Sequence, residues 1–379
     1  MQVNRLARSV AHRAADEIAR RVAWRMDQPP VKPRQVIVDL TDRCFFRCPT
    51  CDKWRARRTS PELTAEAWER VLAALHAWLG PFHLSISGGE PLVRRDVLDI
   101  IAAASALGCT TNLMTNGWLV DDGMARSLVR AGLDNLTLSL NGLRPETHDA
   151  TRGVEGSHAR IVAAIAHFNQ ARRDLAPNGR RQPPTLSLNV IVAGRNAAEL
   201  PDLVRWARNA GIDAVGLQPL VDASNYQPYR QRFRNFAPDW PAHSALWPCE
   251  PDEMDAAIAG LIDLKAAGYP VLNPPGQLAR MRRYFTDPTR RPGGRCYVGL
   301  DNLLIDPYGD ARLCYTMDVV GNVLRRSPRK LWRGAAAARV RRQIRSCSRG
   351  CQLLNCNYRP PLREQLTGLL HRLWSKSRS

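Results

Sequence analysis

The stretch Cys44-Phe45-Phe46-Arg47-Cys48-Pro49-Thr50-Cys51 directly follows the apolar residues 36–40 and places three cysteines on one short loop. Thiolates are the usual protein ligands of iron–sulfur clusters. Because a four-iron cluster held by three thiolates keeps one iron open, a substrate or cofactor can bind there. A structural zinc site usually has four ligands, commonly with a second cysteine pair downstream. The C-x3-C-x2-C spacing therefore predicts a cluster that takes part in chemistry.

A second segment, Gly88-Gly89-Glu90-Pro91, ends the next strand-like run, residues 82–87. Two glycines at a strand end let the backbone approach a ligand closely, and the carboxylate that follows can hold an amine. Alone, the segment would be an ordinary strand-to-helix turn. Together with the cysteine loop, it resembles the radical S-adenosylmethionine (radical SAM) superfamily over roughly residues 35–220.

This resemblance implies a mechanism. A 4Fe–4S cluster on Cys44, Cys48 and Cys51 binds the amine and carboxylate of S-adenosylmethionine at its open iron. One electron from the reduced cluster cleaves the sulfonium C5′–S bond, and the 5′-deoxyadenosyl radical takes a hydrogen atom from an unactivated C–H bond. The protein binds and orients these groups and keeps the radical from water.

The resemblance also implies which residues contact S-adenosylmethionine: Gly88, Gly89, Glu90, Ser139, Arg152, Asn189 and Leu217. The first three are expected at the methionyl amine. Arg152 is expected at the carboxylate, since a guanidinium suits that planar group. Ser139 and Asn189 are expected at the ribose, although ordinary strand-end hydrogen bonds also explain them, and Leu217 on adenine. The chain departs from the family at Thr50, where an aromatic residue is common and would affect the adenine contact.

From residue 35 the pattern alternates between strands and helices. The strand-like runs are residues 35–41, 82–87, 110–115, 135–140, 185–192 and 214–219, and the helix-like runs are residues 65–79, 94–107, 123–131, 158–172 and 197–209. Thr64 is predicted to cap the first of these helices. Such alternation predicts an α/β fold with parallel strands and outer helices. The units are too few for an eight-stranded barrel, so we expect a partial (β/α)6 TIM-like barrel with its ligand sites at the carboxyl ends of the strands.

Five further cysteines lie late in the chain: Cys296, Cys314, Cys347, Cys351 and Cys356. Residues 303–314 read as a β-hairpin with its turn at residues 307–310. The spacing Cys296-x12-Gly309-x4-Cys314 resembles the auxiliary-cluster extension called SPASM or twitch, a small α+β domain. The full SPASM pattern has seven cysteines, so the resemblance implies one auxiliary 4Fe–4S cluster and one spare cysteine, whose identity stays open. A zinc-stapled hairpin is the alternative.

The expected organisation has five parts: a basic amphipathic helix at residues 1–33, the barrel at 34–220, an aromatic and proline-rich connecting region at 221–290, the SPASM-like domain at 291–360 and a basic amphipathic tail at 361–379. The aromatic part of the connecting region, residues 221–250, is predicted to be a substrate lid or a packing linker. Cys109 is expected to be a buried structural thiol. Cys249 could donate a hydrogen atom in the site, but most lone cysteines do not.

The formal net charge is +20, and it is unevenly placed. Between Asp318 and Glu364 the chain has no acidic residue but twelve basic ones: Arg325, Arg326, Arg329, Lys330, Arg333, Arg339, Arg341, Arg342, Arg345, Arg349, Arg359 and Arg363. Such a field attracts anionic partners. The candidates are an acidic low-potential electron donor such as flavodoxin or ferredoxin, a phosphorylated substrate, anionic lipid, or nucleic acid. A solvated basic surface is the alternative, and no recognisable RNA-binding module favours nucleic acid.

The sequence predicts neither a signal peptide nor a membrane span. Residues 1–33 lack the continuous apolar core of a signal peptide, and no apolar run reaches the roughly 18 residues of a membrane span. Reduced thiols and an oxygen-sensitive cluster favour the cytoplasm. The amphipathic residues 2–26 and 362–374 leave peripheral contact with an anionic membrane open.

The sequence alone does not identify the substrate. Relatives with such extensions modify ribosomally made peptides or oxidise small alcohols, so a peptide and a small molecule, phosphorylated or lipid-linked, are both expected candidates. A peptide maturase of this kind would work with a separate leader-binding protein, since only 34 residues precede the first strand. A hypothesis of another class is a non-catalytic iron–sulfur protein that senses oxygen or binds RNA. Gly88-Gly89-Glu90 argues against it, because a sensor needs no clamp for an amine.

Overall fold

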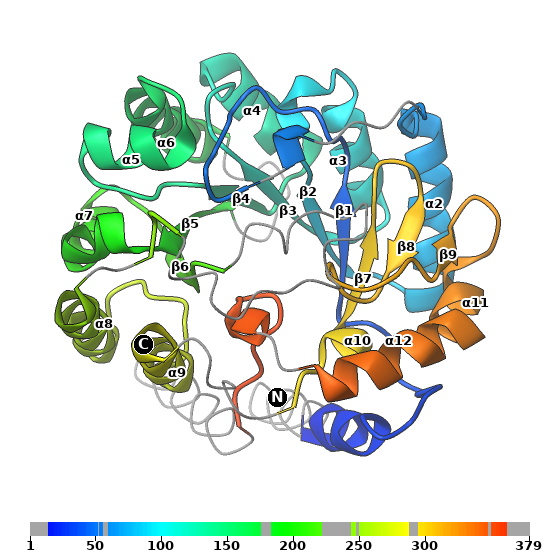
Figure 1. The fold of residues 1–379 in the computed structure, drawn as a ribbon. Coiled ribbons are helices and arrows are strands. Elements are labelled where there is room, and N and C mark those ends of the chain that lie inside the picture. The colour runs from blue at the N-terminus through cyan, green and yellow to red at the C-terminus, as the bar shows by residue number, and fades with distance from the viewer. Residues whose placement is uncertain are drawn as a thin grey trace, which may run out of the picture.

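The computed structural model shows an α/β fold in which helices surround a curved sheet (Figure 1). It describes residues 14–51, 53–55, 60–175, 183–221, 244–247, 250–287, 295–347 and 350–361. Part of the predicted N-terminal helix, most of the aromatic segment, Cys249 and the C-terminal amphipathic tail lie outside these ranges. Residues 14–23 are helical, as predicted for that part. No helix in the described ranges has the length and apolar character needed to cross a membrane.

Six parallel strands form the barrel, as the alternating pattern predicts. They are β1 (Gln35–Asp39), β2 (His83–Ser87), β3 (Thr110–Thr115), β4 (Asn135–Leu138), β5 (Thr185–Val192) and β6 (Ala214–Pro219), and each pairs in parallel with the next. In β5 the apolar side chains Leu186, Leu188, Val190 and Val192 are buried, while the alternate ones are partly exposed or exposed. The buried set belongs to the core beneath the helices, so the other set faces the inside of the barrel.

The helices follow the strands, with shifts that have local causes. They are α2 (Ala65–Leu79), α3 (Val97–Ala106), α4 (Asp122–Ala131), α5 (Pro145–Arg152), α6 (Ser157–Asp174) and α7 (Leu200–Asn209). Thr64 Oγ1 accepts a hydrogen bond from Ala67 N at 3.3 Å, which confirms the predicted cap. Helix α3 begins at Val97, whereas the predicted run begins at residue 94. The reason is that Arg94 is buried and donates to the carbonyls of Leu40 and Leu63, both at 2.9 Å.

The C-terminal extension continues the barrel sheet. Its elements are α10 (Val298–Asp301), β7 (Asn302–Ile305), β8 (Asp310–Arg312), β9 (Gly321–Asn322), α11 (Pro328–Trp332), α12 (Ala335–Ser346) and the 3-10 helix η7 (Gly350–Leu353). β7 and β8 form the predicted antiparallel hairpin. β7 also pairs in parallel with β1, so the strand order is β6-β5-β4-β3-β2-β1-β7-β8-β9. The extension is therefore joined to the barrel through backbone hydrogen bonds.

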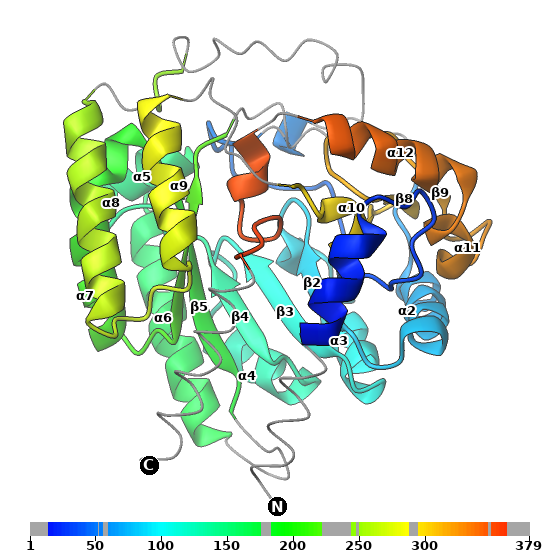
Figure 2. The same ribbon diagram turned by 90° about the horizontal axis from the view of Figure 1, so that it is seen from below.

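Two helices that the sequence analysis did not assign lie beyond β6. They are α8 (Pro251–Ala266), which packs on α7, and α9 (Pro275–Thr286), which packs on α8. Figures 1 and 2 both show η7 between α9 and α10, on the side where the sheet does not close. The 3-10 helix η7 thus lies in the opening of the partial barrel.

Candidate metal centre and cofactor site

The cysteine loop directly follows β1, at the carboxyl end of the barrel. Cys44 and Cys51 are half-buried and Cys48 is buried, and all three are free thiols. The loop turns tightly, because Cys51 N donates to the Cys48 carbonyl at 3.1 Å, and Lys53 N donates to Cys51 Sγ at 3.5 Å. Burial raises the pKa of Cys44 to about 12 and also raises that of Cys51. Metal binding at this loop must therefore release protons.

Gly88 and Gly89 bring their segment against the backbone of the cysteine loop. Gly89 N donates to the Thr41 carbonyl at 2.7 Å, and Glu90 N donates to the Arg43 carbonyl at 2.8 Å. An added Cβ would lie 2.5 Å from Thr41 O at Gly88 and 2.3 Å from Arg43 O at Gly89, closer than atoms can approach. Only glycine fits at these two positions. Their contact with the methionyl amine stays a prediction.

Glu90 fixes the neighbouring strand end. Its carboxylate is buried, and Oε1 accepts from Thr115 Oγ1 at 2.7 Å and Leu92 N at 3.1 Å. Oε2 accepts from Asn116 N at 2.8 Å. Burial raises the pKa of the carboxyl, and these donors partly offset the rise. The side chain joins the turn after β2 to the turn after β3, and its predicted role at the amine stays open to test.

Aromatic contacts join two loops and the end of α5 at this end of the barrel. Phe45, Phe46 and Trp118 pack edge to face, with ring centroids 5.2–6.1 Å apart. The Arg152 guanidinium lies 5.4 Å from the Phe46 ring centre. A Cβ at Gly153 would lie 2.6 Å from Arg47 O, so the end of α5 sits directly on the cysteine loop. The structure thus brings Arg152 to the cysteine loop, and its expected contact with the methionyl carboxylate stays a prediction.

The other predicted contacts lie on β5, β6 and just after β4. Ser139 is half-buried, and its N donates to the Thr115 carbonyl at 3.1 Å. Asn189 is half-buried and accepts a hydrogen bond from Gln218. Leu217 is fully buried in the main core, and its backbone is bonded to the Asn273 side chain. The expected ribose and adenine contacts remain predictions.

Four buried polar atoms near these strand ends have no hydrogen-bond partner in the described part of the chain: Asn116 Nδ2, Asn141 Nδ2, His148 Nε2 and Arg152 Nε. Buried polar groups nearly always have hydrogen-bond partners, so a group of four without partners suits a polar ligand. Together with the glycine cradle and the three thiols, these atoms fit an iron–sulfur cluster with bound S-adenosylmethionine.

His148 was not singled out by sequence analysis. Its Nδ1 accepts from Asn141 N at 3.1 Å, so the ring proton is assigned to Nε2. Burial lowers the pKa of His148 to about 3, helped by the charge of Arg152. His148 is therefore a neutral donor. The only sequence signal was its position four residues before Arg152 on one helix.

Four of the five late cysteines line one cavity. This cavity lies within the extension and is lined by Cys296, Cys314, Cys347 and Cys351, and burial raises the pKa of Cys296 to about 12. Cys356 lines a different cavity, where its carbonyl accepts from Asn302 Nδ2 at 3.1 Å, but it also packs beside Cys351. Burial raises the pKa of the Cys356 thiol, and Cys314 lies near enough to raise it further. Among the described residues, no compact group of three or more His, Cys, Asp or Glu is arranged around a single ion. Thiols spaced around one cavity suit a larger cluster, in which each iron takes its own thiolate.

Two family descriptions match the chain. The radical SAM superfamily matches residues 38–215, and the SPASM iron–sulfur cluster-binding domain matches residues 296–357. A PqqA peptide cyclase of Rhizobium meliloti (strain 1021) is 34% identical over 195 residues, which are 51% of this chain and 49% of that protein. One of Methylocella silvestris is 35% identical over 190 residues, 49% of this chain and 48% of that protein. The chain spans about half the length of these curated relatives.

Solved structures share the fold. Streptococcus suis SuiB bound to the precursor peptide SuiA has a TM-score of 0.59 and 17% identity, over 83% of this chain and 67% of SuiB. The protein anSMEcpe with bound AdoMet and a Cp18Cys peptide has a TM-score of 0.61 and 13% identity, over 85% of this chain and 86% of that protein. At these identities the likeness concerns the fold, which confirms the predicted partial barrel with an extension.

Proposed function

Because the chain combines a radical SAM domain with a SPASM iron–sulfur domain, we propose that it is an enzyme that removes a hydrogen atom from a peptide substrate. The observation that carries this proposal is the convergence of Cys44, Cys48 and Cys51 with the glycine cradle and Arg152 at one end of the barrel. The auxiliary cysteines line a second cavity in the same molecule.

When bound, the open cluster and S-adenosylmethionine supply a one-electron cleavage that yields a hydrogen-abstracting radical. The chain's own residues hold and orient these groups. Cys44, Cys48 and Cys51 supply thiolates, Glu90 fixes the two turns beside them, and Arg152 places a positive charge at the loop for the methionyl carboxylate. Phe45, Phe46 and Trp118 cover the loop with apolar surface, which keeps water from the site.

A peptide is favoured over a small molecule by the relatives. The curated ones are PqqA peptide cyclases, and SuiB and anSMEcpe were solved with peptides. The inner face of the barrel agrees with this choice, because hydroxyl and amide side chains follow one another across neighbouring strands: Ser85, Asn112, Asn135, Thr137 and Ser187. Such uncharged donors and acceptors suit peptide groups. A separate leader-binding protein and a phosphorylated or lipid-linked substrate remain predictions.

An auxiliary 4Fe–4S cluster on Cys296, Cys314, Cys347 and Cys351 is part of the proposal, with Cys356 as the spare thiol. Cys347 immediately follows α12, and the exposed surface of α11 and α12 carries Arg329, Lys330, Arg333, Arg339 and Arg342. A basic surface beside a cluster favours an acidic flavodoxin or ferredoxin as electron donor. Peripheral binding to anionic lipid is the competing use of that charge.

The test is anaerobic. The reconstituted chain is expected to hold about eight irons and to form 5′-deoxyadenosine from S-adenosylmethionine and dithionite. Cys44→Ala should lose about half the iron and all cleavage, whereas Cys109→Ala, a buried thiol elsewhere in the core, should lose neither. Transfer of deuterium from a labelled peptide into 5′-deoxyadenosine identifies the substrate class. Iron without cleavage, with dithionite and with flavodoxin, would refute the enzyme assignment.

A further inference from the structure

The cavity that Cys356 lines lies at the opposite end of the barrel from the cysteine loop. It has a volume of about 380 Å³. Gln35, His83 and Asn302, the first residues of the neighbouring strands β1, β2 and β7, form one wall. Arg34 and Arg359 form another. Parallel strands carry the proposed reaction site at their carboxyl ends, so this cavity is separate from that site.

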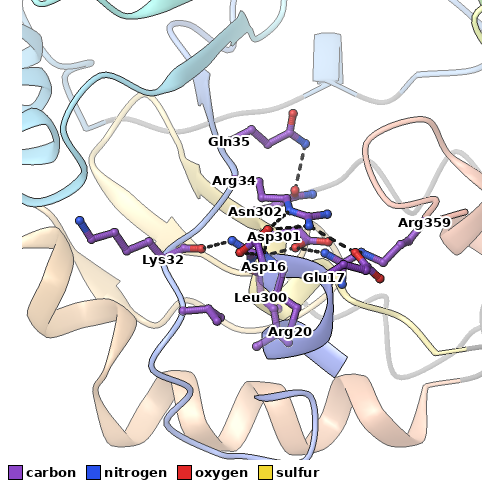
Figure 3. A network of polar contacts seen from close by, with 12 residues as sticks. Asp16, Glu17, Arg20, Lys32, Arg34, Gln35, Leu300, Asp301, Asn302 and Arg359 are labelled. Carbon is purple, nitrogen blue, oxygen red and sulfur yellow. Dashed lines mark hydrogen bonds and ion pairs between the residues drawn. The ribbon is translucent and has the colours of Figure 1, made fainter. Parts of the chain in front are cut away.

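A network of charged side chains lies beside this cavity (Figure 3), and Arg34, Asp301 and Arg359 of the network line it. Arg34 Nη2 lies 2.7 Å from Asp16 Oδ2, and Arg20 Nη1 lies 3.0 Å from Asp301 Oδ1. Arg359 Nη2 lies 3.0 Å from the same Asp301 oxygen. The network joins the N-terminal helix, the start of β1, the start of β7 and the segment that follows the auxiliary cysteines. Arg21 also forms an ion pair with Glu17. Within the described part of the chain the network therefore has four guanidinium groups and three carboxylates.

Arg20 and Arg359 are the two buried cations of this group, and of these only Arg359 lines the cavity. Its side chain is 5% exposed, and its Nη1 has no hydrogen-bond partner among the described residues. Burial lowers the pKa of the Arg359 guanidinium, Asp301 partly offsets this, and Arg34 lowers it further. A buried charge that keeps an unsatisfied donor is costly. An anion in the cavity would satisfy that donor and balance the excess positive charge.

We propose that this cavity binds a small molecule through a carboxylate or phosphate group, held by Arg359 and Arg34 with His83 at the rim. Guanidinium groups bind both kinds of oxyanion with paired, charge-assisted hydrogen bonds. The volume exceeds what a bare ion needs, so the ligand carries more atoms than its anionic group. Because the cavity is lined by both the barrel and the extension, the bound ligand stabilises their junction by mass action. This proposal stands independently of the radical chemistry.

The experiment uses the full-length, cluster-loaded protein under anaerobic conditions. Inorganic phosphate and acetate are titrated separately by calorimetry at constant ionic strength, so that the two arms distinguish the two oxyanions. We expect saturable binding of one anion per chain and a rise in melting temperature. Arg359→Gln and His83→Gln should each weaken binding, the former about tenfold. Arg329→Gln, a matched charge loss on exposed α11, should not change it.

Two outcomes overturn the proposal. One is the absence of saturable heat with either anion. The other is undiminished binding in His83→Gln, a variant that leaves the ion pairs of the network intact and therefore remains informative if Arg359→Gln fails to fold. Iron content and 5′-deoxyadenosine formation are measured on the same samples, so that loss of the anion site is distinguished from loss of the proposed reaction.

Discussion

At the scale of single residues, Glu90 shows how a buried group can support a site through other residues. Its two oxygens accept three hydrogen bonds from the turns that follow β2 and β3. Glu90→Gln keeps the shape, but either orientation of the amide turns a donor toward a backbone N–H. We expect a loss of about 1–3 kcal/mol in the free energy of unfolding, measured with urea. Glu66→Gln, on the exposed first turn of α2, is the control, and equal losses in both variants would contradict the argument.

His148 gives a second prediction, on pH. Its pKa lies at about 3 in the folded chain against an ordinary value of 6.5. Below pH 6.5 the unfolded chain therefore binds a proton that the folded chain refuses, and stability is lost as the pH falls toward 3. The slope is up to about 1.4 kcal/mol per pH unit. His148→Asn keeps an acceptor for Asn141 N but removes the titration. Its urea-unfolding free energy should fall less steeply with acid than that of the parent protein, and parallel curves would exclude this role.

The same residues show what sequence can reveal about a site. Cys44, Cys48, Cys51 and the glycine pair were predicted because their spacing is local and chemically unusual. His148 was missed because its neutrality and its free Nε2 come from burial and from Asn141, which no spacing records. Proposing Cys356 as the spare thiol also required the fold, since only the structure shows that the other four late cysteines line one cavity.

At the scale of elements, strands β3, β5 and β6 and helix α2 have the predicted bounds. The apolar period is strong in β5, Thr64 caps α2, and glycine, proline or asparagine residues lie close to the ends of β3 and β6. The pairing of β7 with β1 was not predicted. A hairpin shows its own antiparallel partner through its turn, whereas a parallel partner some 270 residues away leaves no local mark. The same reason hid the position of η7 in the opening of the barrel.

The side chain of Asn355, two residues after η7, anchors this segment beside β6, and this contact provides a prediction. Its Oδ1 accepts from Asn273 Nδ2 and from Gln277 Nε2, both at 2.9 Å, and Asn273 in turn bonds the backbone of Leu217 in β6. Asn355→Ala leaves these amides short of an acceptor. We expect this variant to lose the auxiliary cluster first, so that iron falls from about eight to about four per chain.

Iron analysis gives the total iron per chain, and electron paramagnetic resonance of the reduced protein shows which of the two clusters is lost. Gln343→Ala, on the exposed face of α12, should keep all the iron. Full iron content in Asn355→Ala would show that the amide contacts do not support the auxiliary site.

At the scale of the whole molecule, the two proposed sites lie at opposite ends of the barrel. The carboxyl ends of the strands gather the cysteines and Arg152, while the opposite ends carry the charged network that joins residues from the first and last parts of the described chain. The basic character of the C-terminal region is visible in the sequence, but which of its arginines are buried is not. Arg341 and the side chain of Arg359 are buried, whereas Arg329 and Arg333 are exposed.

This separation allows a test of the electron donor. If an acidic donor docks on α11 and α12, the double variant Arg329→Glu/Arg333→Glu should slow cluster reduction by flavodoxin about tenfold at low ionic strength, because the positive field that steers the donor is strongly weakened. Reduction by dithionite should be nearly unaffected. Stopped-flow absorbance at several salt concentrations measures both rates. The difference between variant and parent should shrink as salt screens the charges.

A matched control decides whether position or net charge matters. Arg130→Glu/Arg205→Glu changes the net charge by the same amount on α4 and α7, across the barrel from α11 (Figure 1). If both double variants slow the flavodoxin reaction equally, total charge governs the encounter and the proposed docking surface is wrong. If only the α11 pair slows it, the donor approaches on the side where Cys347 ends α12. Electrons would then enter through the extension, which would assign the auxiliary cluster a role in electron transfer.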